Sequence, residues 1–167
     1  MDNGEYSRIV NLYYDEVKRF TYTVCKNLQD AEDITQNVFI KLLKAAGEFD
    51  DDRHIKRWLF KVAVNECRVL WKTPWKSKVD YFVPERSVVR VDRDEEQDRV
   101  LEAILSLKQK YRKTVFLFYY EGYTVKEIAE ITDVNESAVL KRLQRAREKI
   151  KAQLEININR KEVRENA

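Results

Sequence analysis

The chain contains very few residues that interrupt a helix. Only three Gly and two Pro occur among its 167 residues. In a helix interior these residues cost about 1 and 3 kcal/mol relative to Ala, so most of this chain can continue a helix once it has formed. Apolar residues make up 44% of the sequence, which is enough to bury packed cores. We therefore predict an all-α protein.

Three amphipathic helices are predicted in the first half of the chain. Apolar residues recur at intervals of three and four from Tyr6 to Val24, and this period predicts a helix over about 6–27. A second helix begins near Asp30, where carboxylates favour the N-terminal end of the helix dipole, and ends near Gly47. A third helix follows the acidic sequence EFDDD and ends near Pro74.

The apolar period is lost between Val79 and Asp98, and the charge balance changes there too. Residues 79–98 carry 3 basic and 7 acidic side chains, whereas residues 1–78 carry 14 and 12, and residues 99–156 carry 12 and 8. A negative segment between two mildly basic ones indicates a linker that joins two domains. The sequence SVVRV inside it has strand-like composition, but no partner strand is nearby. We assign residues 157–167 to a polar tail that frays.

Helical spacing resumes at Arg99 and defines the second domain. A further helix is predicted over about 109–120 and ends at Gly122, and TVKEIAEI forms a short helix after it. TDVN is a turn, and the last helix runs to about residue 156. A short helix, a turn of about four residues and a longer basic helix form the helix-turn-helix pattern. The predicted fold is two small helical domains joined by a flexible linker, the second ending in a helix-turn-helix.

The last predicted helix has one apolar face and one basic face. Its apolar face consists of Val139, Leu143, Ala146, Ile150 and Leu154. The opposite face carries Ser137, Lys141, Gln144, Arg145 and Glu148, with Arg142, Arg147 and Lys149 flanking it within reach of a DNA backbone. Lys, Gln and Arg are the side chains that reach base edges in a major groove.

A charged helix face is often only solvated, but two features favour DNA contact here. From Ser137 to Lys151 there are six Lys or Arg and one acid. The helix is also preceded by a short capped one: Asn135 is placed as the N-cap of the long helix, and Thr124 caps the short helix and offers its hydroxyl to a phosphate.

A second basic stretch has different chemistry. Between Arg53 and Lys78 there are eight Lys or Arg and one acid, and all three tryptophans of the chain lie in the same stretch. Cations interleaved with flat rings suit single-stranded nucleic acid, because bases stack and phosphates pair. Tryptophans at helical spacing are also common in cores, and we expect Trp58 to be buried. One domain for duplex DNA and another for separated strands suggest promoter opening.

Several classes of protein are disfavoured by composition. The single histidine, His54, leaves no cluster with zinc-ligand spacing, and Cys25 and Cys67 are each expected to be a buried thiol. We predict no metal and no cofactor. No apolar run of about 18 residues and no signal peptide are present, which predicts a cytoplasmic protein without membrane insertion. No Gly-rich phosphate loop or nucleophile motif occurs, so no catalytic residue is predicted and the chain is not expected to be an enzyme.

Three motifs resemble a known family. They are DAEDITQNVFIKLLK, RWLFKVAVNECRVL and SLKQKYRKTVFLFYYEGYTVKEIAEITDVNESAVLKRLQRAREKI. Over about residues 5–75 and 98–153 the chain is similar to bacterial RNA polymerase sigma factors of the extracytoplasmic-function (ECF) subgroup. The resemblance implies sigma domain 2 in residues 1–78, a linker in 79–98 and sigma domain 4 in 99–156, with no domain 3 between them.

The resemblance also implies how the first domain works. In the family, the DAEDITQNVF helix docks on the coiled coil of the β′ subunit of core polymerase. Asn37 stands where the pattern often has Glu. The predicted core-polymerase contacts are Asp30, Asp33, Gln36, Asn37 and Phe39. The RWLFKVAVN helix and the loop before it melt the −10 element and capture a flipped base. Trp58 and Asn65 match the pattern there, whereas Val64 stands where many members have Arg. The predicted −10 contacts are Arg53, Lys56, Arg57, Lys61, Asn65, Arg68, Trp71 and Lys72.

By the same resemblance, the second domain binds the −35 element as duplex. The predicted contacts are Thr124, Ser137, Leu140, Lys141, Arg142, Gln144 and Arg145. The family often has Gly-Thr-Val-Lys-Ser where this chain has SAVLK, so the preferred −35 sequence is not carried over.

The expected partners are core RNA polymerase, through its β′ coiled coil and β subunit, promoter DNA in duplex and single-stranded form, and an anti-sigma factor. The acidic linker is expected to lie in the RNA exit path. Two alternatives remain from the residues alone: a dimeric regulator that binds an operator without polymerase, and a helical adaptor whose basic faces are merely solvated.

Overall fold

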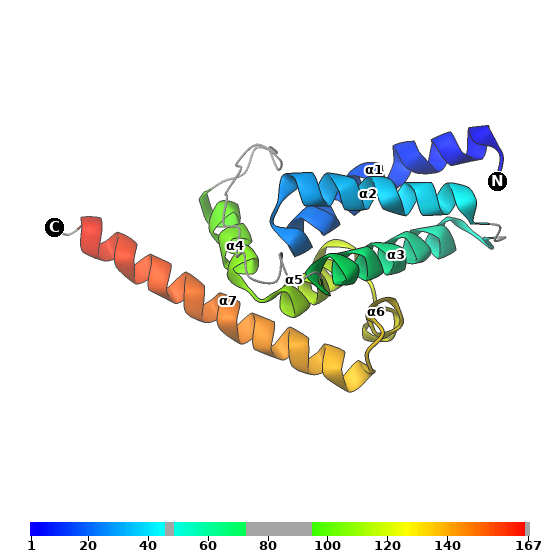
Figure 1. The fold of residues 1–167 in the computed structure, drawn as a ribbon. Coiled ribbons are helices and arrows are strands. Elements are labelled where there is room, and N and C mark those ends of the chain that lie inside the picture. The colour runs from blue at the N-terminus through cyan, green and yellow to red at the C-terminus, as the bar shows by residue number, and fades with distance from the viewer. Residues whose placement is uncertain (46–48, 73–94, 166–167) are drawn as a thin grey trace. The chain divides into compact units, whose positions relative to one another are not determined.

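We describe the protein from a computed structural model, in which the backbone of residues 1–45, 49–72 and 95–165 is placed, with side chains described through residue 156 (Figure 1). These ranges are mostly helical and contain no strand. The elements are α1 (Asn3–Cys25), α2 (Leu28–Lys44), α3 (Asp52–Lys72), α4 (Glu95–Ser106), α5 (Gln109–Val115), the π-helical turn η1 (Phe116–Tyr120), α6 (Val125–Thr132) and α7 (Glu136–Glu165). The chain divides into two compact units.

The first unit is built from α1, α2 and α3, which pack against one another (Figure 1). Each helix buries one stripe of side chains, and the largest fully buried ones include Ile9, Phe20, Leu42, Leu59 and Phe60. The rings of Phe20 and Phe60 meet edge to face, with 5.2 Å between their centroids, and join α1 to α3. The apolar residues whose three- and four-residue spacing predicted the helices are therefore the ones that form the core. This is expected when helices are stabilised mainly by packing of an amphipathic face.

The first two helices of this unit begin at side-chain caps. The Asp2 carboxylate accepts the Glu5 N–H at 2.7 Å, and the Asn27 side chain accepts the Asp30 N–H at 2.9 Å. Each cap satisfies one of the N–H groups that lack a partner in the first turn of a helix. Polar residues thus set the points at which α1 and α2 begin.

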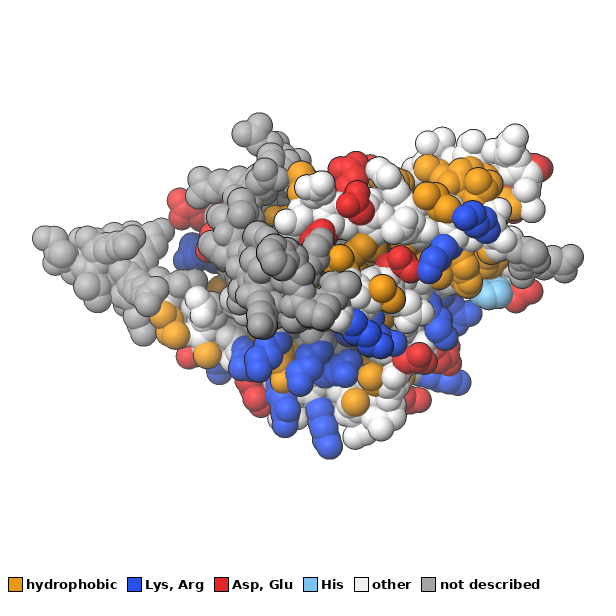
Figure 2. All heavy atoms as spheres, in the orientation of Figure 1, with side chains coloured by type: hydrophobic (Ala, Val, Ile, Leu, Met, Phe, Trp, Pro, Cys, Tyr) orange, Lys and Arg blue, Asp and Glu red, His pale blue; other side chains and the backbone are white. Residues whose placement is uncertain are grey.

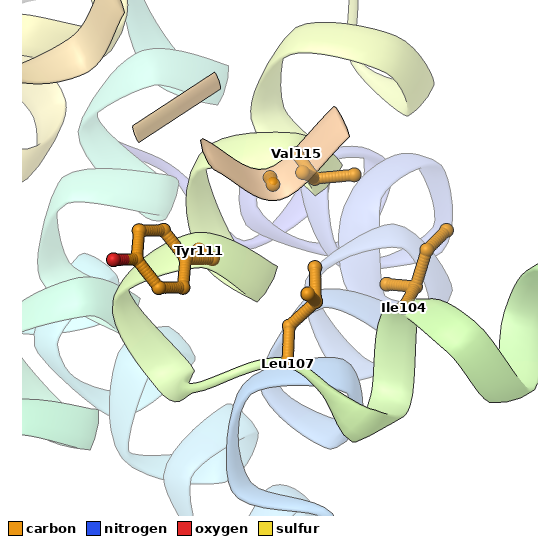
Figure 3. Close-up of a cluster of buried hydrophobic side chains, with 5 residues drawn as sticks. Ile104, Leu107, Tyr111 and Val115 are labelled. Carbon is orange, nitrogen blue, oxygen red and sulfur yellow. The ribbon is translucent and has the colours of Figure 1, made fainter. Parts of the chain in front are cut away.

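The second unit contains α4, α5, η1, the first part of α6 and α7. Its core includes a cluster made by Ile104, Leu107, Tyr111 and Val115 against Ala146 of α7 (Figure 3). Gly122 follows η1 with a φ of 69°, a left-handed conformation that favours glycine, and the chain turns there toward α6. The cluster fixes the middle of α7 to the helices that precede it.

Two predicted boundaries are wrong, and both errors concern polar residues. We expected the linker to extend to Asp98, but α4 begins at Glu95 and carries Glu96 and Asp98 in its first turn. Carboxylates at that end of a helix interact favourably with its dipole, so the acidic run starts the helix instead of preceding it. We also expected a frayed tail after residue 156, but α7 continues to Glu165. The rest of the proposed linker, including SVVRV, lies outside the described residues, as does Trp75.

Candidate functional site

Exposed polar side chains form one stripe along α2. Asp33, Gln36 and Asn37 follow one another at helical spacing and are all exposed. Asp30 lies in the first turn of α2, at the start of the same stripe, and is half-buried. The exposed carboxylate of Asp33 and the exposed amides of Gln36 and Asn37 suit a partner that offers hydrogen-bond donors and positive charge.

Phe39 departs from the prediction for this surface. Its side chain is 3% exposed and its ring lies 5.5 Å from that of Tyr14 on α1, so it belongs to the core and not to the stripe. Two apolar residues that the sequence analysis did not select are exposed on α2 instead, Ile40 at 46% and Leu43 at 55%. Ile40 continues the spacing of Gln36 and Asn37. An apolar side chain beside polar ones is the composition expected of a docking surface.

The exposed face of α3 is positively charged. Lys61, Asn65, Arg68 and Lys72 recur at intervals of three and four residues and therefore share one side of the helix, where Arg68 is half-buried and the other three are exposed. The single acid in this helix after its first turn, Glu66, forms an ion pair with Lys41 of α2. The pairing neutralises the one acid that α3 itself carries after its first turn, and the other charged residues on this side of α3 are cations.

The other residues predicted for −10 contact are distributed differently. Arg53 is exposed at the start of α3, whereas Arg57 and Trp71 are half-buried. Lys56 is turned toward α1: its Nζ lies 2.8 Å from the Glu16 carboxylate and 5.9 Å from the centroid of the Tyr13 ring. Lys56 therefore holds α3 against α1, contrary to the prediction that it faces a nucleic acid.

An aromatic group lies at the N-terminal end of α3. Trp58, which we expected to be buried, is half-buried and meets Phe49 edge to face at 5.7 Å. Phe49 also contacts the ring of His54, with centroids 5.4 Å apart. Val64, at the position where family members often carry Arg, is 2% exposed and lies in the core. A cationic face that begins at a group of rings is suited to phosphates together with unstacked bases.

Both predicted caps of the helix-turn-helix are confirmed. The Asn135 side chain accepts the Ala138 N–H at 2.8 Å and begins α7. Thr124 and Glu127 form a capping box: Thr124 Oγ1 accepts the Glu127 N–H at 3.2 Å, and the Glu127 carboxylate accepts the Thr124 N–H at 2.9 Å. Thr124 Oγ1 also donates to that carboxylate at 3.1 Å, so its proton is directed to Glu127 and not toward a phosphate. That part of the prediction for Thr124 is not supported.

We predict that the Asn135 cap can be tested by unfolding. Asn135→Ala should lower the free energy of unfolding by about 1 kcal/mol, because the Ala138 N–H loses its acceptor. Denaturant unfolding followed by circular dichroism measures this difference. Asn135→Asp keeps an acceptor oxygen and should stay close to the wild type. An equal loss in both variants would argue against the cap.

The face of α7 opposite the core carries the predicted duplex contacts. Val139, Leu143 and Ala146 are buried against the unit, at 1% exposure or less. On the other side the exposed residues are Ser137, Leu140, Lys141, Gln144 and Arg145. Leu140 is 56% exposed although it is apolar, and Arg142 is half-buried at the edge of the face. Figure 2 shows Lys and Arg side chains gathered over α7.

Two tyrosines contact the arginines at the borders of this face. The Tyr111 ring packs in the core cluster, and its hydroxyl points away from the other labelled side chains (Figure 3). That hydroxyl accepts a hydrogen bond from Arg145, which lowers the pKa of Tyr111. On the other border, Arg147 Nε donates to the Tyr119 hydroxyl at 2.6 Å. This hydrogen bond orients Arg147 at the border of the face, where its side chain remains exposed.

Comparison with known proteins identifies the family. The Sigma-70 region 2 family matches residues 9–76, and the Sigma-70 region 4 family matches residues 97–150. The ECF RNA polymerase sigma factor SigW of Bacillus subtilis is 28% identical over 175 residues, which cover 92% of this chain and 90% of SigW. SigV of the same organism is 30% identical over 138 residues, 81% of this chain and 82% of SigV. The chain is an ECF sigma factor.

Solved structures agree with this fold. The sigma factor RpoE of Bartonella quintana, determined with the anti-sigma factor NepR, matches with a TM-score of 0.71 at 17% identity and covers 91% of this sigma factor and 98% of its own chain. CnrH, determined with the cytosolic domain of CnrY, has a TM-score of 0.68 at 22% identity, over 93% and 90% of the two chains. Within the described ranges of this sigma factor, no helix combines the length and apolar character needed to cross a bilayer.

The family assignment settles the broad function. A sigma factor associates with core RNA polymerase and directs promoter-specific initiation, and sigma factors as a class are not enzymes. The expectations from the resemblance are thus confirmed for family, fold class and function. The operator-binding regulator and the adaptor are not favoured.

Proposed function

We propose a distribution of tasks over three helix faces of this sigma factor. The α2 stripe docks on the β′ coiled coil of core polymerase, the α3 face captures the −10 element as separated strands, and the α7 face reads the −35 element as duplex. Sigma domain 2 then contains α1, α2 and α3, and sigma domain 4 begins with α4 at Glu95 and ends with α7. The observation that carries this assignment is the contrast in charge between the faces: α2 presents carboxylates and amides, whereas α3 and α7 present cations.

At the −35 element, α7 enters the major groove with the residues nearest its start. Asn135 begins the helix, and Ser137, Leu140 and Lys141 lie within its first two turns. Lys141 and Gln144 supply hydrogen bonds to base edges. The exposed Leu140 is suited to the methyl group of thymine, which explains why an apolar side chain is tolerated on a polar face.

At the −10 element, α3 stabilises strands that are already apart. The stripe of Lys61, Arg68 and Lys72 pairs with phosphates, and Asn65 offers an amide to a base. Binding energy gained on the single strand offsets the few kcal/mol needed to unstack a base step, so the open state is favoured without nucleotide hydrolysis by this chain.

An anti-sigma factor is the expected inhibitor. RpoE and CnrH were determined in complexes with NepR and with the cytosolic domain of CnrY. A protein that covers the α2 stripe or the α7 face of this chain would prevent docking or promoter contact. The site of action is the cytoplasm, where core polymerase and DNA are present.

Run-off transcription tests the proposal directly. Core polymerase with this chain on a library of promoters should produce transcripts from a subset that shares two elements, one melted near −10 and one bound as duplex near −35. Permanganate footprinting on the selected promoters should show unpaired thymines only at the first element. Purified chain that does not bind core polymerase, or transcripts that start equally from all templates, would contradict the proposal.

A further inference from the structure

The two cysteines of this chain lie side by side although they are far apart in sequence. Cys25 is the last residue of α1, and Cys67 lies in the C-terminal part of α3, 42 positions later. Their Sγ atoms are 3.6 Å apart, which is contact distance for two sulfur atoms. Both are thiols in this structure and both are buried, with Cys25 at 7% and Cys67 at 2% exposure. These are the only cysteines of the protein.

Packing alone does not require this pairing. A buried thiol behaves as a small apolar side chain, and each cysteine taken separately fills its place in the core as Ala or Val would. Contact between the two sulfur atoms allows a disulfide to form between them, which neither cysteine could do alone. A disulfide has an S–S length near 2.05 Å, so bond formation needs each sulfur to move by roughly 0.8 Å. A change of that size is within the range of small side-chain adjustments.

We propose that Cys25 and Cys67 form a reversible disulfide that ties α1 to α3 when hydrogen peroxide is present. The thiolate of one cysteine attacks the peroxide, the O–O bond breaks, and a sulfenic acid and a hydroxide ion form. The second thiolate then attacks the sulfenic sulfur, the S–S bond forms and the S–O bond breaks, which releases a second hydroxide. With the two thiol protons, the products are one disulfide and two waters, and the peroxide is reduced by two electrons.

The structure favours Cys25 as the sulfur that reacts first. It is the more exposed of the two, and it lies at the end of α1, where Lys26 adopts a left-handed conformation with a φ of 58° and the chain leaves the helix. Helix ends open locally more often than helix interiors, so a small oxidant reaches Cys25 before Cys67. Cys67, held inside α3, is then the resolving thiol. Burial limits access to both, so the reaction is slower than that of an exposed reactive cysteine.

The disulfide would join α3, on the buried side opposite the proposed DNA-binding face, to the end of α1. Cys67 is adjacent to Arg68, which is half-buried, and two residues from Asn65, which is exposed. A crosslink between residues 42 positions apart removes conformational freedom from the unfolded chain, which raises thermal stability. The pair thus acts as a redox-sensitive crosslink beneath the proposed strand-capturing face. This chemistry is independent of whether that face binds DNA.

Treatment of the purified full-length chain with hydrogen peroxide tests the inference. After denaturation and alkylation, the monomer should have lost the mass of two hydrogens, and peptide mapping should show Cys25 joined to Cys67. The rate should not depend on protein concentration, as expected for an intramolecular bond. The oxidised chain should melt more than about 5 °C higher than the reduced chain, and dithiothreitol should reverse the shift.

Cys25→Ala and Cys67→Ala provide the controls, and circular dichroism shows whether each still folds. Neither variant can lose two hydrogens within a monomer, and neither should show the rise in melting temperature. The same peroxide treatment of wild-type chain in denaturant confirms that the oxidant is active. A native chain that remains unchanged while the denatured chain is oxidised would overturn the inference. Addition of oxygen atoms only, or disulfides only between molecules, would overturn it too.

Discussion

Asp33→Ala and Gln36→Ala are each expected to weaken binding to core RNA polymerase about tenfold, and to do so on every promoter. Both side chains are exposed on the α2 stripe, so their removal leaves the fold intact while it deletes a charge or an amide from the proposed docking surface. A tenfold change corresponds to about 1.4 kcal/mol, a usual cost for truncating a contact near the centre of an interface. Fluorescence anisotropy of labelled sigma factor titrated with core polymerase measures the dissociation constant.

Two further variants distinguish docking from general damage. Asp15→Ala removes an exposed acid of α1, outside the α2 stripe, and should leave the dissociation constant unchanged. Ile40→Ala tests the apolar residue that the structure adds to the stripe, and should weaken binding in the same direction as Asp33→Ala. Unchanged binding in Asp33→Ala and Gln36→Ala, or a loss confined to certain promoters, would contradict the assignment of α2 to core polymerase.

Phe39→Ala should behave differently from the variants on the stripe. Its side chain is buried against Tyr14, so truncation should cost roughly 3–5 kcal/mol of unfolding free energy through loss of packing. Urea unfolding measures this loss, and any weaker binding to polymerase should track the fraction of unfolded protein. A fully stable Phe39→Ala protein that fails to bind polymerase would restore the original prediction for this residue.

Helix positions and buried faces were the most predictable part of this protein. The period of apolar residues in α1 reports directly on the core, because side chains three and four apart share one face of a helix. Phe39 was placed wrongly because its assignment did not use the spacing of apolar residues. It was assigned to the docking surface by resemblance to a motif, although Val38 and Leu42 are buried beside it and the exposed stripe runs through Gln36 and Asn37.

Boundaries made of polar residues were less predictable, for a physical reason. The first turn of α4 carries three acids and no apolar residue, so the spacing of apolar residues cannot reveal it. The helix dipole nevertheless favours acids at that end. The end of α7 has no Gly or Pro to stop it, and a polar composition by itself does not end a helix.

Contacts between helices could not be derived from one sequence. Lys56 looks like any other cation of its stretch until Glu16 is placed 2.8 Å from it. Arg147 is similar: its role depends on Tyr119, a residue 28 positions earlier. The cysteine pair, 42 positions apart, is a third case. Each requires knowledge of which helices pack together and in what register, and apolar spacing leaves many such arrangements open.

Arg145→Ala is expected to reduce −35 discrimination by roughly 1–3 kcal/mol, or about five- to 150-fold, at one or two base pairs of the element. The residue is exposed at the border of the α7 face, next to Ala146, which belongs to the same buried cluster as Tyr111. Run-off transcription on templates with single base-pair changes measures the discrimination. Gln144→Ala gives a matched comparison, because it should reduce discrimination at a different base pair of the −35 element. A uniform loss on all templates, with a smaller dependence on salt, would instead place Arg145 on a phosphate.

Tyr111→Phe tests whether Arg145 must be held in place by the Tyr111 hydroxyl in order to recognise the −35 element. The ring remains in the cluster with Leu107 and Val115, so folding should be retained, but the hydroxyl that accepts from Arg145 is lost. One hydrogen bond to a charged group contributes about 1.5–3 kcal/mol where it is buried and less where water competes, so the variant should lose less discrimination than Arg145→Ala, at the same base pairs. The double variant should be no worse than Arg145→Ala alone, because both changes act through one guanidinium. Losses that add in the double variant would show that Tyr111 acts on promoter recognition without Arg145.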